Sequence, residues 1–170
     1  MKARTSVGVG FALLVATGLA IASRGDPVQD ARRPAPVVFV CRNGVAMSVW
    51  SAAYFNRLAA ERGLRERAVA RAALPSYREV PLRMRFALAL DGFRLDGYRP
   101  RVIDAADARG AELVVVIDTE LPPEALGTEP GRTELWQGFP PMREQYFPSR
   151  AALEQRVETL VERLAEGERS

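Results

Sequence analysis

Three residue types are missing or nearly missing from this chain of 170 residues: it has no histidine, a single cysteine (Cys41) and a single lysine. Without histidine the chain lacks the commonest metal ligand, and it cannot build a Cys–His or Ser–His catalytic pair. One cysteine allows no disulfide within the chain. The 23 arginines against one lysine are typical of a GC-rich, bacterial genome. The sequence therefore predicts neither a metal site nor a cofactor.

A strong charge of one sign is also absent. The formal net charge is only +3, from 24 basic and 21 acidic residues spread along the chain. No basic stripe of the kind found in nucleic-acid-binding proteins stands out, so we predict no nucleic-acid partner. A chain of this length with 48% hydrophobic residues can bury one sizeable core. We expect one globular domain with an N-terminal appendage.

The appendage begins with a targeting segment, residues 1–22. Lys2 and Arg4 precede an apolar run at residues 7–22 that ends in the Ala-Ile-Ala pattern of a signal-peptidase site. We predict a signal peptide, with a membrane anchor as the alternative, because sixteen mostly small apolar residues are short for about 30 Å of hydrocarbon. Either way the protein is exported, to the periplasm or to the outer face of the inner membrane. Residues 23–36 are polar and proline-rich and are predicted to form a flexible leader.

The remaining chain alternates short apolar strands with helices, and residues 37–166 are predicted to form one domain followed by a tail at 167–170. Buried strands that alternate with helices imply an α/β fold with a parallel sheet covered on both faces. The pattern predicts strands at 37–40, 68–72 and 113–117, a short strand at 101–103 leading into residues 104–109, helices at 48–62, 81–90 and 149–165, and an apolar segment at 135–136.

Cys41 lies at the mouth of the first strand–helix turn, where a parallel sheet places its ligand site. This arrangement aims backbone N–H groups and the positive end of a helix at one point, which suits an anion and favours a thiolate. A buried, inert thiol is the alternative, because free cysteine is among the most buried residue types. We predict Ser48 as the N-cap of the following helix and Gly63 as its end.

The turn resembles the phosphate loop of the low-molecular-weight protein tyrosine phosphatases and of the arsenate reductases built on the same fold. Their signature is a hydrophobic strand, Cys, five residues, Arg, and Ser or Thr opening a helix. This chain has the strand, Cys41, the five-residue spacing and Ser48. The resemblance covers residues 37–164 and implies a three-layer, doubly wound sandwich with a four-stranded parallel sheet. It also implies that Cys41 is the nucleophile and that an anion is bound by Arg42, Asn43, Gly44, Val45, Ala46, Met47 and Ser48.

The chain departs from this family at both charged catalytic positions. Met47 stands where the family has its arginine, and Pro140 stands where the family has the aspartate that protonates the leaving group. Arg42 directly follows the cysteine, where the family's side chain points away from the phosphate. Asn43 and Gly44 stand in the reverse of the family's order, which puts the shape of the loop in question. Methionine offers neither charge nor hydrogen-bond donors to a phosphoryl group.

Two functions follow as hypotheses. In the first, the chain is a catalytically impaired or inactive pseudoenzyme that acts as a binding module for a phosphate-like anion or a phosphoprotein. In the second, it is a divergent phosphatase or arsenate reductase-like enzyme that uses Cys41 as nucleophile. A cysteine relay is disfavoured because no second cysteine exists, although an external thiol could serve. The first is favoured because electrostatic stabilisation is usually the largest catalytic contribution.

Three further side chains each have two interpretations. Asp118 follows a predicted strand and is either a carboxylate at the rim of the site or a turn residue. Trp136 and Tyr146 are either aromatics at the rim or members of the core. The sequence makes no prediction of the oligomeric state.

Overall fold

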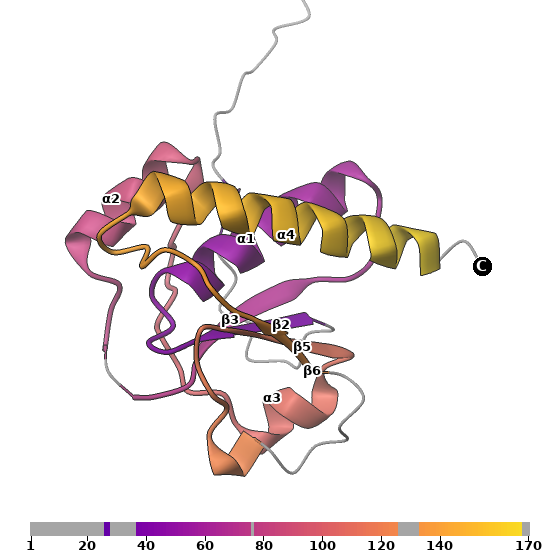
Figure 1. Ribbon diagram of the computed structural model, residues 1–170, viewed down its shortest axis with the longest axis horizontal. Coiled ribbons are helices and arrows are strands. Elements are labelled where there is room, and N and C mark those ends of the chain that lie inside the picture. The colour runs from indigo at the N-terminus through magenta and orange to yellow at the C-terminus, as the bar shows by residue number, and fades with distance from the viewer. Residues whose placement is uncertain (1–25, 28–36, 76, 126–132, 168–170) are drawn as a thin grey trace, which may run out of the picture.

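The computed structural model describes residues 26–27, 37–75, 77–125 and 133–167, and its centre is a four-stranded parallel sheet in the order β3-β2-β5-β6 (Figure 1). Valine-rich runs with both faces covered form the two central strands, as parallel sheets require. The α/β class and the four-stranded parallel sheet are as predicted. The strands are β2 (Val37–Cys41), β3 (Ala68–Ala72), β5 (Leu113–Ile117) and β6 (Thr133–Trp136).

Helices cover both faces of the sheet, which gives the three predicted layers (Figure 1). On one face lie α1 (Met47–Glu61) and the long C-terminal α4 (Tyr146–Gly167), with α2 (Leu82–Leu90) beside the start of α4. On the other face lies α3 (Ala105–Gly110), together with the 3-10 turn η1 (Pro123–Ala125). The N-terminus of α3 carries a capping box. The Asp104 carboxylate accepts from two backbone N–H groups, and the Asp107 carboxylate accepts from the backbone N–H of Asp104.

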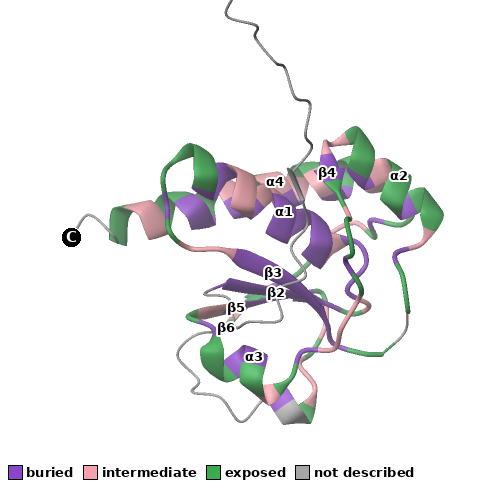
Figure 2. Cartoon of the chain, turned by 180° about the vertical axis from the view of Figure 1, so that it is seen from behind, coloured by how far each residue is buried: buried purple, intermediate pink, exposed green. Residues whose placement is uncertain are grey.

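The core divides into two parts because successive strand residues point to opposite faces. In β2, Val37, Phe39 and Cys41 pack toward α1 and α4, whereas Val38 and Val40 pack toward α3. Figure 2 shows the strands buried between the two helical layers. Alternation therefore turns the Cys41 side chain toward the layer that contains α1.

One charged pair is buried on the α3 side of the sheet. Arg71 of β3 is 0% exposed and Asp107 of α3 is 3% exposed. Two guanidinium nitrogens of Arg71 donate to the two carboxylate oxygens of Asp107 at 2.8 and 2.9 Å, and Arg101 adds a third bond at 2.8 Å. A buried ion pair persists only with such full hydrogen bonding, so this contact fixes α3 against the sheet.

A second, two-stranded sheet was not predicted from the sequence. Residues Asp26–Pro27, within the predicted leader, form β1 and pair in parallel with β4 (Phe93–Arg94). Because β4 follows α2 after two residues, the chain enters the described domain beside the end of α2. Among the helices that the structure describes, none is long and apolar enough to cross a membrane, and the predicted anchor at residues 7–22 lies outside the described residues.

The predicted boundaries need four corrections. Ser48 is not the N-cap of α1, because the helix begins at Met47 and Ala46 occupies the cap position without a side-chain hydrogen bond. The predicted strand at 101–103 is reduced to a single bridge between Val102 and Ala72. The apolar segment at 135–136 is part of an edge strand, β6, and the last helix begins three residues earlier than predicted, at Tyr146. Gly63 does end α1, with a positive φ of 72°.

Candidate functional site

Cys41 is the last residue of β2 and lies level with the last residues of its neighbours. It pairs in register with Ala72 of β3 and with Ile117 of β5, which in turn pairs with Trp136 of β6. The carboxyl ends of all four parallel strands therefore meet around the thiol. This is the edge at which doubly wound sheets place their ligand sites.

The thiol touches one hydroxyl group. Cys41 Sγ lies 3.0 Å from Ser48 Oγ, and both side chains are buried, with 4% and 0% exposure. Either group can donate in the neutral state, but a Cys41 thiolate could only accept, so the hydroxyl would then donate to it. The residue predicted as a helix cap therefore contacts the candidate nucleophile instead.

The loop between Cys41 and α1 is shaped by contacts with two neighbouring segments. Gly44 has a φ of +62°, and a Cβ there would lie 3.0 Å from both the backbone nitrogen and the Cβ of Ala72. The Tyr98 hydroxyl donates to the Gly44 carbonyl at 2.7 Å in a buried hydrogen bond. Only glycine fits this position without strain, so the reversed Asn43-Gly44 order is compatible with a well-defined loop.

The backbone at Cys41 and Arg42 is held by the chain that follows β3. Ala73 N donates to Cys41 O and Leu74 N donates to Arg42 O, both at 2.9 Å. The ladder between β2 and β3 thus continues past the ends of the strands. The Arg42 side chain is exposed. It lies at the mouth of the site rather than within it.

Met47 lies in the first turn of α1, half-buried and packed against the core. Its thioether chain also lines the cavity beside Cys41. No side chain caps the N-terminus of α1 and no acidic residue stands in its first turn. The helix start can therefore still offer N–H donors to an anion, although the loop contributes no guanidinium at this position.

The cavity beside Cys41 has a volume of about 200 Å³ and two dissimilar walls. One wall is the loop from Cys41 to Met47, and the other is the segment between β6 and α4. The first wall contributes apolar side chains except at its rim, whereas the second contributes two charged ones. Its lining residues are Cys41, Arg42, Asn43, Val45, Ala46, Met47, Asp118, Pro141, Met142, Arg143 and Glu144.

Four lining residues were not predicted as site residues from the sequence, namely Pro141, Met142, Arg143 and Glu144, and the last two are the charged ones. Both are exposed, and Arg143 Nη1 donates to the Tyr77 hydroxyl at 3.2 Å across the cavity mouth. They follow Pro140, the position to which the resemblance assigns the missing acid, by three and four residues. Their closeness in sequence to Pro140 is the one signal for them, because a loop has no periodicity that shows which side chains face the thiol.

Asp118 is both a lining residue and a structural one. It has a positive φ of 45°, and its carboxylate accepts from Gly138 N at 2.8 Å and from Phe139 N at 3.0 Å. It therefore orients the segment that leads to the second wall of the cavity. Both interpretations of this residue hold in part.

The two aromatic residues with open interpretations are structural. Trp136 is buried and packs edge-on against Phe39 with ring centroids 5.7 Å apart. The Tyr146 hydroxyl donates to Asp91 at 2.7 Å, and the same carboxylate accepts from Trp50 at 2.7 Å. Burial, and then the hydrogen bond to Asp91, raise the pKa of Tyr146 well above its ordinary value. Tyr146 is therefore no candidate for acid–base work near neutral pH.

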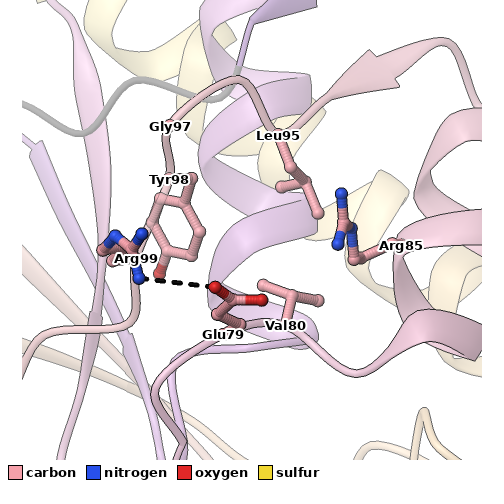
Figure 3. A pocket seen from close by; sticks show the side chains of 7 residues that line it. All are labelled: Glu79, Val80, Arg85, Leu95, Gly97, Tyr98 and Arg99. Atoms are coloured by element: carbon pink, nitrogen blue, oxygen red, sulfur yellow. Dashed lines mark hydrogen bonds and ion pairs between the residues drawn. The ribbon is translucent and has the colours of Figure 1, made fainter.

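Another cavity, of about 170 Å³, is lined by Tyr98 and by residues before and within α2 and after β4. Figure 3 shows the Tyr98 ring beside the ion pair of Arg99 and Glu79, with Arg85 of α2 on the facing wall. The Arg99–Glu79 contact measures 3.4 Å between exposed side chains. Glu79 therefore offsets the charge of one of the two arginines that line this cavity.

Within the described ranges, no group of three or more His, Cys, Asp and Glu side chains is close enough to hold a metal ion.

Comparison with known proteins shows the fold. No protein-family model and no curated protein matches the chain. An arsenate reductase from Archaeoglobus fulgidus matches with 24% identity and a TM-score of 0.60, over 74% of this chain and 98% of that one. A low-molecular-weight protein tyrosine phosphatase from Bacillus subtilis matches with 16% identity and a TM-score of 0.63, over 76% and 97%. A protein tyrosine phosphatase from Entamoeba histolytica matches with 18% identity and a TM-score of 0.65, over 78% and 97%. The predicted likeness to this fold is confirmed.

Proposed function

From the fold shared with the low-molecular-weight phosphatases and arsenate reductases, we propose that this chain is an exported binding module whose Cys41 site is catalytically impaired. Its ligand is a phosphate-like anion, either free or carried by a phosphoprotein. The observation that carries this proposal is Met47, which occupies the position of the family's arginine. Its side chain packs against the core and lines the cavity beside the thiol.

The cost of this replacement is large for phosphoryl transfer, in which catalysis consists mainly of positioning and of stabilising charge on the equatorial oxygens. Removing one preorganised donor to a developing oxyanion typically costs about 3–4 kcal/mol of transition-state stabilisation. Loss of the general acid at Pro140 would lower the rate by about a further 10²–10⁴-fold. Together these losses favour a site that holds an anion without turning it over.

Binding of an anion does not require stabilisation of a transition state, and several groups that attract an anion are present. The N-terminus of α1 is free of side-chain caps, and Arg42 and Arg143 stand at the rim of the cavity. Both guanidinium groups are exposed, so each adds a modest, screened attraction for an anion. We expect weak binding of free phosphate, and tighter binding only when a larger ligand also contacts the apolar wall.

Hydrolysis of an aryl phosphate by the full chain in mild detergent tests the catalytic part of the proposal. We expect no turnover that depends on Cys41, shown by equal rates for the parent and for Cys41→Ser. Met47→Arg is expected to gain activity, because it restores a guanidinium at the start of α1. Leu135→Arg, which adds the same charge at an exposed position away from the cavity, is the matched control. Turnover in the parent that disappears in Cys41→Ser would overturn the proposal.

Export rests on residues 1–22 and is tested separately. Fractionation of cells that express the full chain should recover it from the periplasm or the inner membrane. Intact mass then distinguishes a chain that begins at Ser23 from one that keeps its N-terminus. Recovery of the intact chain from the cytoplasm alone would contradict this part of the proposal.

A second candidate function, a divergent phosphatase, is supported by the Cys41–Ser48 contact and by Glu144 in the facing wall. In such an enzyme the Cys41 thiolate attacks phosphorus while the bond to the leaving oxygen breaks. Glu144 is the candidate donor of the proton that this oxygen needs, and water then hydrolyses the thiophosphate to inorganic phosphate and the free thiol. Trapping of a phosphorylated Cys41 by rapid acid quench would support it. Loss of turnover in Glu144→Gln, but not in Gln145→Ala, would assign the acid.

A further inference from the structure

Helix α2 exposes a continuous apolar stripe to solvent. Leu82, Phe86 and Leu90 are 80%, 67% and 70% exposed. They recur every four residues, so they lie within about 80° of one another around a helix of 3.6 residues per turn. Met84 and Leu88, on the opposite side of the helix, are buried in the core. The exposed residues are therefore not needed to fix α2 to the domain.

A further exposed aromatic residue extends this stripe, and two arginines lie beside it. Phe147, in the first turn of α4, is 69% exposed, and its neighbour Tyr146 donates a hydrogen bond to Ala87 O of α2 at 3.1 Å. Arg83 and Arg85 are exposed and lie to either side of the apolar face, and the helix contains no acidic residue. We call Leu82, Phe86, Leu90 and Phe147 the α2 stripe.

The path of the chain places its N-terminal apolar segment close to this stripe. Residues Asp26–Pro27 pair with Phe93–Arg94. Figure 2 shows β4 beside α2, and β4 begins three residues after the last residue of α2. The apolar run at residues 7–22 ends only four residues before β1. Four residues span at most about 14 Å. Wherever that run is anchored, the α2 end of the domain must be near.

We propose that the α2 stripe lies on the surface of the bilayer in which the chain's own N-terminal segment is anchored. Exposed leucine and phenylalanine flanked by arginine are typical of helices that lie in a membrane interface, with the cations at the anionic headgroups. A helix as short as α2 would bind lipid weakly alone. A tether about 14 Å long makes this contact intramolecular and so raises its effective concentration.

The proposal takes the anchor, the alternative to a cleaved signal peptide, as the state of residues 1–22. It also has a consequence for the candidate site, because Phe147 follows Glu144 by three residues. The charged wall of the Cys41 cavity would then open near the headgroups. The proposal does not depend on whether Cys41 is catalytic.

Tryptophan fluorescence of the full chain in vesicles tests the proposal. Phe86→Trp is incorporated into vesicles of phosphatidylcholine and phosphatidylglycerol, with either ordinary or brominated acyl chains. Leu135→Trp is the matched control, because Leu135 is also exposed, at 64%, but lies on the edge strand β6. The two native tryptophans, Trp50 and Trp136, are buried and give a common background.

We expect a blue shift of the added emission and a loss of its intensity in brominated vesicles for Phe86→Trp, and neither for Leu135→Trp. Replacing Arg83 and Arg85 by Gln in the Phe86→Trp chain should reduce the loss in vesicles that contain phosphatidylglycerol. Equal, solvent-like emission from both tryptophans would overturn the proposal and leave the stripe to a protein partner. A blue shift that grows with protein concentration in lipid-free detergent would also overturn it, in favour of a second copy of the chain.

Discussion

The two walls of the Cys41 cavity differ in how they are built. The wall from Cys41 to Met47 is fixed by buried contacts: a hydroxyl on the thiol, a tyrosine on the Gly44 carbonyl and a backbone ladder to the residues after β3. The opposite wall, Pro141 to Glu144, is exposed except at Met142, and it carries charged side chains. The first wall holds the thiol and its loop in a fixed position, and the second wall contributes the charged side chains of Arg143 and Glu144.

In an efficient phosphoryl-transfer site both properties must act at the same atoms, because preorganised charge is worth most where water is excluded. Here the first wall contributes Met47 at the start of α1 and a charged side chain only at its rim, and the charged side chains of the second wall are exposed to solvent. In this chain the ordered backbone of the cavity and its exposed charged side chains lie on different segments. Four variants test this difference between the two walls.

Gly44→Ala is expected to have the largest effect. A Cβ at Gly44 would be strained by the φ of +62° and would meet Ala72 at 3.0 Å. Strain and overlap together should lower the free energy of unfolding by about 3 kcal/mol. Gly63→Ala is the matched control, because Gly63 has a φ of +72° with nothing within 4 Å, and it should lose only about 1 kcal/mol. Equal losses in urea denaturation would show that the loop is not tightly packed.

Tyr98→Phe removes the hydroxyl that holds the Gly44 carbonyl at 2.7 Å. A buried acceptor left without its donor should cost about 1–2 kcal/mol in the free energy of unfolding. In Tyr77→Phe the lost hydroxyl accepts from exposed Arg143, so urea denaturation should change by less than about 0.5 kcal/mol. If the two variants lose the same stability, the buried wall is no more rigid than the exposed one.

Ser48→Ala tests the contact between the hydroxyl and the thiol. Loss of a hydrogen bond to a charged group costs about 1.5 kcal/mol, so alkylation of Cys41 by iodoacetamide at neutral pH should slow about tenfold. Ser51→Ala is the control, because Ser51 is also 0% exposed on α1 and makes no hydrogen bond to Cys41. A faster reaction in Ser48→Ala would mean that the hydroxyl shields the thiol rather than stabilising its anion.

The buried wall could largely be predicted from the sequence, and the reason is periodicity. The apolar run ending at Cys41 specifies a strand, and Gly63 specifies the end of the helix that follows. The role of Ser48 could not be read in this way, because the helix begins two residues earlier than a Ser48 cap requires. A shift of one or two residues at a helix end changes a cap into a side chain that faces the site.

The exposed wall and the α2 stripe could not be predicted for different physical reasons. Arg143 and Glu144 stand in a loop, where no repeating pattern states which way a side chain points. Helix α2 was predicted, but both of its sides are apolar, since Met84 and Leu88 alternate with Phe86 and Leu90. Sequence alone does not say which side the domain buries. The buried Arg71–Asp107 pair was missed because its partners are 36 residues apart.

Arg143→Ala is expected to have the smallest effect and to test the exposed wall directly. If inorganic phosphate binds beside Cys41, it should protect the thiol from iodoacetamide, and loss of one exposed cation should weaken that protection about threefold. Stability should not change, because Arg143 is exposed. Arg156→Ala removes the same charge from an exposed position on α4 that does not line the cavity, so it is the control. If both variants weaken the protection by phosphate equally, phosphate responds only to the net charge of the protein. The charged wall would then have no part in the site.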